Sequence, residues 1–502
     1  MVLYFAAMLT IGFVYSKRSN SSTKQYFAGG RGVGPWLTAL SAEASDMSGW
    51  LLMGLPGVAY FTGAADPMWT AIGLALGTYL NWKLVARRLR RYSVVAGDAI
   101  TIPDFFSKRF HDDRNIVSTI AALIILVFFC VYVGSCFVTV GKLFSTLFGW
   151  DYHLTMVIGA AIVFAYTIIG GYLSVVVTDF IQGLLMFFAL AVVFIGSVAS
   201  AGGIDNTVAF LKGIPGFLDG THVATPILND AGEQIVKAGQ AMFGAPADYG
   251  IITIISMLAW GLGYFGMPHI IIRFMSIRSN KDLRKSSVIG ISWTFIILIF
   301  SVGSGLIGRM FLGEIEDSSV VFITMVRTIF PAVVSGILLS AILAAAMSTC
   351  DSQLLASASA FASDVYKPVF RKNASDKEML WAGRIVVVII SVIALLIAAN
   401  PNSGTIMGLV ENAWGVFGAA FGPVILLSLF WRRFTFGGAV AGIVVGALVD
   451  VLWLVFLKGT GVYEIIPGFF AGLVAAVVVT VLGKAPGKDV EELYDAAVAM
   501  KD

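Results

Sequence analysis

Residues 42–56 place acidic and hydroxyl side chains inside an otherwise apolar segment near the start of the chain. The polar interruption consists of Glu43, Ser45, Asp46, Ser48 and Gly49. A carboxylate at the middle of a membrane costs about 2.5 to 3.5 kcal/mol, so it is retained where a cation, a proton or a cavity compensates it. The Ser-Gly pair beside Asp46 favours a broken helix, whose exposed carbonyl groups can bind a cation or a polar solute. This stretch therefore predicts a site for an ion and a solute.

A second polar stripe lies in residues 343–359, where small and hydroxyl side chains crowd one predicted helix. Spacings of three and four place on one face Ala345, Ser348, Thr349 and Ser352. Such a stripe is typical of a packing interface between membrane helices. It equally fits a cation site, in which hydroxyl oxygens are completed by carbonyl groups near Ala44 and Met47. About five oxygen ligands would suit a hard monovalent ion such as sodium.

Residues 260–269 contain three glycines and a proline within another apolar segment. Kinks of this kind also occur in ordinary membrane helices, so this feature alone is weak evidence. Two interrupted helices in one chain favour a transporter built from inverted repeats, with its site near the bilayer midplane.

The composition excludes an ordinary soluble protein, because 58% of the 502 residues are hydrophobic and 13% are charged. The three cysteines lie in apolar runs without metal-ligand spacing, and the four histidines are scattered singly. We therefore expect neither a disulfide framework nor a metal cluster, and no nucleic-acid partner. An enzyme is also disfavoured, because His269 and Asp46 lack a Gly-x-Ser-x-Gly partner motif.

Apolar runs of spanning length predict thirteen transmembrane helices, read against a need of about 20 residues for each. Their ranges are 1–16, 35–63, 68–86, 116–147, 152–170, 171–199, 249–272, 286–312, 326–362, 380–399, 404–431, 437–457 and 464–482. With the N-terminus outside and the C-terminus in the cytoplasm, basic residues gather at the inner ends, as the positive-inside rule requires. The exceptions are Lys142, Lys212, Lys237, Arg309, Arg327 and Lys458.

The whole of residues 1–486 is expected to form a single membrane domain. Its longest loop, 200–248, lies outside and is predicted to be a partly structured cap. Residues 487–502 form a short cytoplasmic tail, predicted as an amphipathic helix or a disordered end.

Several long motifs resemble the sodium/solute symporter family, and most closely its bacterial proline-transporting branch. These motifs are SAEASDMSGWLLMGLPG, residues 260–275, ILLSAILAAAMSTCDSQLL, WGVFGAAFGPVILLSLFWRRFT and, for the signature segment, GGYLSVVVTDFIQGLLM. The resemblance runs from about Tyr26 to Pro486. It implies an all-α polytopic fold, with two inverted five-helix repeats (LeuT type), one helix before them and two after.

The same resemblance implies a sodium-coupled symporter that imports L-proline by alternating access. It assigns sodium to the carbonyl groups of Ala44, Met47 and Ala345 and the hydroxyl groups of Ser348 and Thr349, with Asp46 supporting the site. The residues that it assigns to the solute or to its coupling with sodium are Ser48, Gly49, Trp260, Tyr264, Met267 and Pro268. It also implies a protein of the bacterial inner membrane that works as a monomer in the lipid bilayer.

Three positions depart from the family pattern, namely Glu43 for glycine, Met267 for glutamine and Asp351 for a small polar residue. Loss of a polar side chain at Met267 could change the solute. Asp179, Asp351 and Ser352 match an additional sodium site of some relatives, and we hypothesise that the two carboxyls bind a second cation or share a proton. The alternative is that Asp351 points into cytoplasmic water.

Other functions remain open. The solute could instead be pantothenate, a sugar acid or a different amino acid. A sensor with a transporter-like core is less favoured, because the residues after 483 are too few for a signalling domain.

Overall fold

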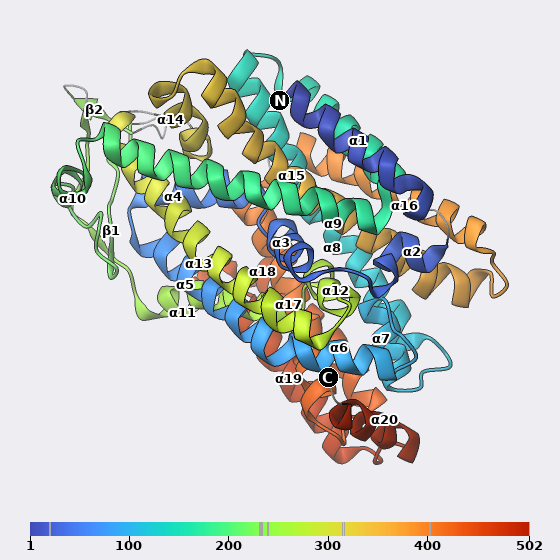
Figure 1. The fold of residues 1–502 in the computed structure, drawn as a ribbon. Helices are drawn as coiled ribbons and strands as arrows, with labels where there is room; N and C mark the ends of the chain where they lie inside the picture. Colours follow the sequence, from blue (N-terminus) through green and yellow to red (C-terminus); the bar gives the residue numbers. More distant parts are fainter. Residues whose placement is uncertain are drawn as a thin grey trace.

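The computed structural model describes residues 1–19, 22–229, 234–237, 240–313, 315, 317–400 and 403–500, and most of them are helical (Figure 1). Its strands are two residues long and form two antiparallel pairs. These strands are β1 (His222–Val223), which pairs with β4 (Ala247–Asp248), and β2 (Val236–Lys237), which pairs with β3 (Gln240–Ala241). They lie in the long loop 200–248 with α10 (Ile204–Lys212), so the predicted cap is partly structured.

The first half of the bundle holds one broken helix and several long ones. Its elements are α1 (Val2–Ser19), α2 (Thr23–Ala28), η1 (Gly29–Arg31), α3 (Pro35–Asp46), η2 (Trp50–Gly54), α4 (Leu55–Thr62), α5 (Ala65–Leu80), η3 (Asn81–Ala86), α6 (Arg87–Val95), α7 (Ile102–Arg109), α8 (Ile116–Phe148) and α9 (Tyr152–Ser200). Helix α9 contains Gly171 at φ +64°, a conformation that glycine adopts without a Cβ penalty. The break between the predicted spans 152–170 and 171–199 lies at this residue.

The second half repeats the pattern of a broken helix followed by long ones. Its elements are α11 (Ile251–Leu258), η4 (Ala259–Phe265), α12 (Pro268–Ser276), α13 (Asn280–Phe311), η5 (Ser318–Val320), α14 (Val321–Ile329), α15 (Ala332–Phe361), η6 (Ala362–Phe370), α16 (Asp376–Ala399), α17 (Ile406–Phe430), α18 (Phe436–Phe456), η8 (Lys458–Thr460), α19 (Ile465–Leu482) and α20 (Lys488–Ala499). The predicted span 326–362 began too early, because residues up to Ile329 belong to α14 and Pro331 caps the start of α15. Proline fits this position, where the helix needs no amide donor.

Length and apolar composition alone qualify eight of the described helices as membrane spans, or nine with α11–η4 and α12 as one bent span. Four shorter apolar helical stretches, Val2–Ser16, Trp50–Thr62, Tyr152–Ala165 and Ser318–Ile329, add to this set. The first three lie in predicted spans, but they are too short to qualify alone. The total of thirteen therefore stays a prediction.

The centre of the bundle is formed by the broken helices and two long ones. Every residue of α12 is buried, and so is α3 from Thr38 to Asp46. Most residues of α15 and α17 are buried, whereas most residues of α18 and α19 are not. The two broken helices therefore lie inside the protein, where other helices can satisfy the backbone groups at each break.

Helix α5 approaches η4 closely because glycines face each other at the contact. A Cβ on Gly77 would lie 2.4 Å from the carbonyl oxygen of Gly261, and one on Gly261 would lie 2.4 Å from that of Gly73. Small residues permit this distance between membrane helices. The glycines predicted only as helix breakers thus also act in packing.

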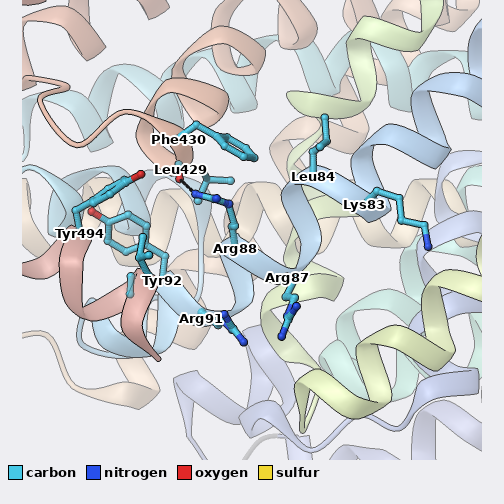
Figure 2. A pocket seen from close by; sticks show the side chains of 11 residues that line it. Lys83, Leu84, Arg87, Arg88, Arg91, Tyr92, Leu429, Phe430 and Tyr494 are labelled. Atoms are coloured by element: carbon cyan, nitrogen blue, oxygen red, sulfur yellow. Dashed lines mark hydrogen bonds between the residues drawn. The ribbon is translucent and has the colours of Figure 1, made fainter. Parts of the chain in front are cut away.

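The C-terminal helix α20 docks on the end of the bundle that carries α6 and α7 (Figures 1 and 2). Arg432 holds it there with hydrogen bonds to both carboxylate oxygens of Asp495, at 2.9 and 2.8 Å, and to Glu491 at 2.6 Å. These bonds hold the pKa of the Asp495 carboxyl below its usual value. Of the two predicted forms of the tail, the helical one is found.

Gly77→Ala should lower the thermal unfolding midpoint of the detergent-solubilised protein. The new methyl group meets a rigid backbone, and overpacking of this kind costs about 1 to 3 kcal/mol. Gly336→Ala in α15 is the matched control, because no heavy atom lies within 4 Å of its Cβ position. The control should equal or slightly exceed the wild type, since alanine favours a helix. Equal midpoints for both variants would contradict the close α5–η4 contact.

Candidate functional site

The first helix break lies directly after Asp46, where α3 ends and Met47 leaves the helical conformation at φ −86° and ψ 80°. Gly49 has ordinary helical angles, φ −52° and ψ −23°, so its backbone freedom does not make the break. Its small size is required instead, because a Cβ would lie 2.0 Å from the Thr139 hydroxyl oxygen on α8. The expectation that the Ser-Gly pair permits the break was therefore wrong in its reason for Gly49.

Asp46 connects the first break with the second. Its Oδ2 accepts a 2.5 Å hydrogen bond from the hydroxyl of Tyr264 in η4, while its Oδ1 is buried without a hydrogen-bond partner among the described residues. Its carbonyl oxygen accepts hydrogen bonds from Tyr132 and Trp50, each at 3.2 Å. The side chain is fully buried, and its carboxyl group accepts a hydrogen bond from one neutral donor, Tyr264.

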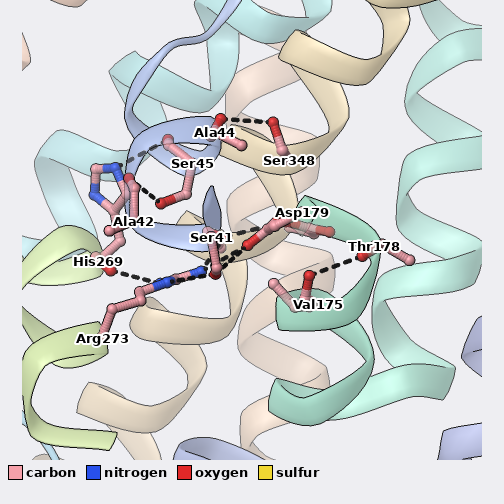
Figure 3. Close-up of polar contacts among 12 residues, drawn as sticks. Ser41, Ala42, Ala44, Ser45, Val175, Thr178, Asp179, His269, Arg273 and Ser348 are labelled. Carbon is pink, nitrogen blue, oxygen red and sulfur yellow. Dashed lines mark hydrogen bonds and ion pairs between the residues drawn. The ribbon is translucent and has the colours of Figure 1, made fainter. Parts of the chain in front are cut away.

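The predicted sodium ligands Ala44, Ala345 and Ser348 lie together where α3 passes α15. The Ser348 hydroxyl donates to the carbonyl oxygen of Ala44 at 2.7 Å and approaches that of Ala345 at 3.2 Å (Figure 3). The Thr349 hydroxyl is buried and has no hydrogen-bond partner in the described part of the chain. Fully buried Met47 directly follows Asp46, and its amide donates to the Glu43 carbonyl at 3.0 Å. Carbonyl and hydroxyl oxygens of this kind fit a hard cation, and the unpaired Thr349 hydroxyl could turn a lone pair toward it.

The second break lies between η4 and α12. The segment Ile251–Phe265, which is α11 with η4, makes an angle of 44° with α12. Met267 is extended and fully buried, and Pro268 begins α12. A Cβ on Gly266 would lie 2.0 Å from the carbonyl oxygen of Phe417, so α17 covers this break closely. The predicted residues Met267 and Pro268 thus occupy the start of a half-helix, whose N-terminal amides can bind a carboxylate.

Aromatic side chains gather beside the second break. The ring of Trp260 lies 5.4 Å from that of Tyr463 and 6.3 Å from that of Trp414, and Tyr264 meets Trp414 edge to face at 5.0 Å. The Trp414 indole donates to the Trp260 carbonyl oxygen at 2.7 Å, which satisfies one main-chain group of η4. Trp414 and Tyr463 did not emerge from the sequence as site residues, because single aromatic residues in apolar helices carry no distinctive spacing.

His269 joins the two broken helices at a further point. Its Nε2 lies 3.2 Å from the carbonyl oxygen of Ser45 (Figure 3). Its ring meets Phe129 and Tyr132 edge to face. The sequence showed it only as a solitary histidine. Among the residues that the structure describes, no group of three His, Cys, Asp or Glu could hold a metal.

Arg273 occupies the region of the predicted second cation site. Its guanidinium pairs with Asp179 Oδ2 at 3.2 Å, and it donates to the hydroxyl groups of Ser41 and Ser352. Ser41 also donates to Asp179 Oδ2 at 2.6 Å (Figure 3). Asp351 is fully buried and accepts from Ser352 at 3.3 Å, so the alternative that it points into cytoplasmic water was wrong.

Glu43 is another buried carboxylate, one turn before Asp46 in α3. Its Oε1 accepts from the Trp82 indole at 2.7 Å, and its Oε2 accepts from the Thr294 hydroxyl at 2.6 Å. Both donors are uncharged. Thr294 comes from α13, which packs on α3, and Trp82 comes from η3. This departure from the family pattern is therefore matched by its surroundings.

Comparison with known proteins gives one family model and many relatives. The model of the sodium:solute symporter family matches residues 26–446. The osmoregulated proline transporter OpuE of Bacillus subtilis is 45% identical over 98% of this chain and 96% of its own. Sodium/proline symporter 2 of Staphylococcus saprophyticus is 43% identical over 99% and 94%, and the sodium/proline symporter of Staphylococcus aureus is 44% identical over 98% and 93%.

Two solved structures show the same fold. A Na+-coupled sialic acid symporter, solved substrate-bound and outward-open, has a TM-score of 0.77 at 21% identity and covers 96% of this chain and 97% of its own. A closed nucleobase-cation-symport-1 family transporter has a TM-score of 0.56 at 14% identity, with 94% and 98% covered. The all-α transporter fold with discontinuous helices is thereby confirmed.

Arg273→Met should strongly destabilise the protein, because it leaves Asp179 buried without its countercharge. Breaking a buried pair in this way costs about 3 to 5 kcal/mol. The double variant Arg273→Met with Asp179→Asn removes the charge as well and should recover part of the loss, measured as the thermal unfolding midpoint. Arg278→Met, which removes the pair between the exposed Arg278 side chain and Asp282, is the control and should change the midpoint less. If the double variant lost as much stability as Arg273→Met and Asp179→Asn lose in sum, measured separately, the pairing would be contradicted.

Proposed function

This chain belongs to the sodium:solute symporter family, and from that premise we propose that it imports L-proline together with sodium by alternating access. The names of its bacterial relatives support the solute. The observation that carries the ion site is the 2.7 Å contact between the Ser348 hydroxyl and the Ala44 carbonyl. It brings oxygen atoms of a broken helix and an unbroken helix to one place.

In the proposed cycle, sodium binds among the carbonyl groups of Ala44, Met47 and Ala345 and the hydroxyl groups of Ser348 and Thr349. To do so it takes the place of the hydrogen bond between Ser348 and Ala44, since the hydroxyl must then turn its lone pair to the ion. The ion links α3 with α15 and favours one arrangement of the two helices. An inside-negative membrane potential adds about 2.3 kcal/mol per charge per 100 mV to sodium entry.

The proline pocket is proposed between the two breaks. Trp260, Tyr264 and Pro268 form an apolar wall that suits a pyrrolidine ring, and Trp414 extends it. The main-chain amides at the start of α12 favour the solute carboxylate. Met267 adds apolar surface here, which favours a solute without a polar side chain over a sugar acid or pantothenate.

Coupling between ion and solute is assigned to the segment that joins Asp46 with Ser48 and Gly49. Asp46 supports the sodium site from the end of α3 and binds Tyr264 of the solute pocket at 2.5 Å. An ordered Asp46–Tyr264 bond therefore favours sodium binding and proline binding at once. By linkage, sodium and proline raise each other's affinity by the same factor.

For the second cation we propose that Arg273 supplies the positive charge at Asp179. A sodium ion bound at Asp179, Asp351 and Ser352 would have to lie beside this guanidinium and would be repelled by it. One sodium per proline is the stoichiometry that follows. The Asp179–Arg273 pair then has a structural role.

The chain is a multi-pass membrane protein, which we place in the bacterial cell membrane with its N-terminus outside and its C-terminus in the cytoplasm. The basic residues of α6, α7 and α13 support this orientation. Residues 1–486 act as one membrane domain, with 487–502 as a tail. We infer that the monomer is sufficient, because the proposed ion and solute residues all come from one chain.

Ser348→Ala with Thr349→Ala should abolish the sodium dependence of proline uptake. The test uses labelled proline and proteoliposomes with an imposed sodium, lithium or proton gradient. Ser340→Ala on the same helix is the control and should keep sodium-driven uptake, because its hydroxyl bonds the Gly336 carbonyl one turn earlier in the same helix. Unchanged sodium dependence in the double variant would contradict the ion site. Stronger competition by pantothenate, a sugar acid or another amino acid than by proline would contradict the solute.

Tyr264→Phe should weaken the coupling between sodium and proline. The variant removes the hydroxyl that binds Asp46, so the factor by which sodium raises proline affinity should fall about tenfold, within the usual range of coupling. Proline Kd values with and without sodium give this factor. Tyr366→Phe is the control, because its hydroxyl donates to Glu378 at 2.7 Å and not to Asp46. An equal loss of affinity in both conditions would show a role in the pocket alone.

A further inference from the structure

Asp450 of α18 carries a buried carboxyl group that lacks a hydrogen-bond donor among the described residues. None of its surface is exposed, and neither of its carboxylate oxygens has a hydrogen-bond partner in that part of the chain. An ionised carboxylate without donors or a countercharge is very costly in such surroundings, and the group becomes neutral instead. The interior of a membrane protein offers no bulk water to replace the missing donors. A ligand is therefore needed to compensate Asp450.

A second carboxyl group, that of Glu464 at the start of α19, lies beside Asp450. A Cβ on Gly415 of α17 would lie 3.0 Å from Oδ2 of Asp450 and 3.3 Å from Cγ of Glu464, so both side chains converge on one point. Glu464 is 3% exposed, and its Oε1 also lacks a hydrogen-bond partner among the residues that the structure describes. Two negative charges this close repel each other, which disfavours ionisation of both groups.

Glycines let α17, α18 and α19 pack closely around this pair of carboxyl groups. A Cβ on Gly446 would lie 2.3 Å from the Ala419 carbonyl oxygen, and one on Gly468 would lie 2.7 Å from the Ala419 Cβ. The same position on Gly468 is 2.8 Å from the Cβ of Asp450. Small residues permit this close approach of membrane helices. Water that solvates an ionised Asp450 would have to separate the three helices.

The surroundings of the pair add more negative than positive charge. The charged groups near Glu464 and its neighbours come from three elements, namely Glu411 of α17, Asp66 of α5 and Lys458 of η8. Lys458 is exposed, so water screens its charge. The nearby tyrosine hydroxyls are used elsewhere, because Tyr463 donates to the Glu411 carbonyl oxygen at 3.1 Å and Tyr132 of α8 donates to that of Asp46 at 3.2 Å.

A proton suits these two carboxyl groups better than a metal ion does. A metal ion needs a shell of several oxygen ligands, whereas one proton neutralises one carboxyl group. Neighbouring carboxyl groups that cannot both ionise hold a proton between them for this reason. We propose that Asp450 and Glu464 form a proton-binding site, in which Asp450 stays protonated at neutral pH. The bound proton keeps α17, α18 and α19 together.

The proton site lies behind the aromatic wall of the proposed solute pocket. Gly415 directly follows Trp414, and Glu464 directly follows Tyr463, whose ring lies 5.4 Å from that of Trp260. Loss of the proton draws water between the helices that hold these rings, so proline binding should weaken at alkaline pH. This consequence rests on the proposed function, whereas the proton site does not.

The test compares the wild type with Asp450→Asn, which keeps the shape of the protonated carboxyl group but cannot ionise. The thermal unfolding midpoint of the full-length protein in a neutral detergent is measured from about pH 6 to about pH 9. A carboxyl group that holds its proton in the folded protein and loses it in the unfolded chain makes stability decrease as the pH rises. The wild-type midpoint should therefore fall toward alkaline pH. The variant should fall less and exceed the wild type by about 2 °C or more at about pH 9.

Glu492→Gln is the control, because it removes a carboxyl group at an exposed position of α20, and its midpoint should follow the wild type at each pH. A midpoint of Asp450→Asn below that of the wild type at every pH would overturn the proposal. Replacing choline chloride with sodium chloride tests for a metal ion. A stabilisation by sodium that is present in the wild type and absent in Asp450→Asn would also overturn it.

Glu464→Gln is a second variant that tests the same site. It removes one of the two like charges, so its midpoint should also fall less toward alkaline pH than that of the wild type. A fall as steep as in the wild type, in this variant and in Asp450→Asn alike, would overturn the proposal.

Proline Kd values in the same buffers test the effect on the solute pocket. The wild-type affinity should fall about fivefold from about pH 7 to about pH 9, and that of Asp450→Asn should stay within about twofold. An equal fall in both proteins would overturn the link between the proton site and the pocket. If neither protein binds proline at any pH, the proposed solute is wrong, while the unfolding midpoints still decide the proton site.

Discussion

Two broken helices inside the bundle impose the constraint on which the rest of the structure depends. A helix break within a membrane leaves main-chain groups without their usual partners, and each unsatisfied group is costly in that environment. Here the partners come from other helices. Ser348 donates to the Ala44 carbonyl oxygen, and Trp414 donates to the Trp260 carbonyl oxygen. The Nε2 of His269 lies within hydrogen-bond distance of the Ser45 carbonyl oxygen. The buried long helices α15 and α17 therefore supply hydrogen-bond donors to main-chain carbonyl groups of the broken helices.

The same contacts would let the proposed sodium site act as a moving part. A carbonyl group satisfied by a hydroxyl can exchange that donor for a cation, because both use the same oxygen lone pairs. The Ser348–Ala44 contact is of this type, and it joins two helices rather than two turns of one helix. Replacing the proton of a hydroxyl with an ion at this point changes how strongly α3 is tied to α15. In the proposed site, this local exchange of ligands would change the relative stability of two arrangements of the bundle.

Sequence patterns predicted the parts of this arrangement that are local in the chain. The polar interruption at Asp46, the hydroxyl group of Ser348 and the break before Pro268 were all visible, because each disturbs an apolar run. The resemblance to the family brought them together. The roles of His269 and Arg273 could not be predicted, since each depends on partners more than 70 residues away. Gly49 was explained wrongly for the same reason, because its requirement comes from Thr139 on another helix.

Three of the buried carboxylates near the breaks, Asp179, Glu43 and Asp46, differ in what compensates them. Asp179 faces the permanent charge of Arg273, which fixes it in one state. Both oxygens of Glu43 are bound by neutral donors, so its contacts are complete. Asp46 has one oxygen bound to Tyr264 and the other without a hydrogen-bond partner among the described residues. A carboxylate with unused acceptor capacity responds most to a cation that arrives nearby, because its own charge is the least compensated. Of these three, Asp46 is therefore the carboxylate best placed to respond to sodium at the proposed site, although it is not among the ligands that we assign to the ion.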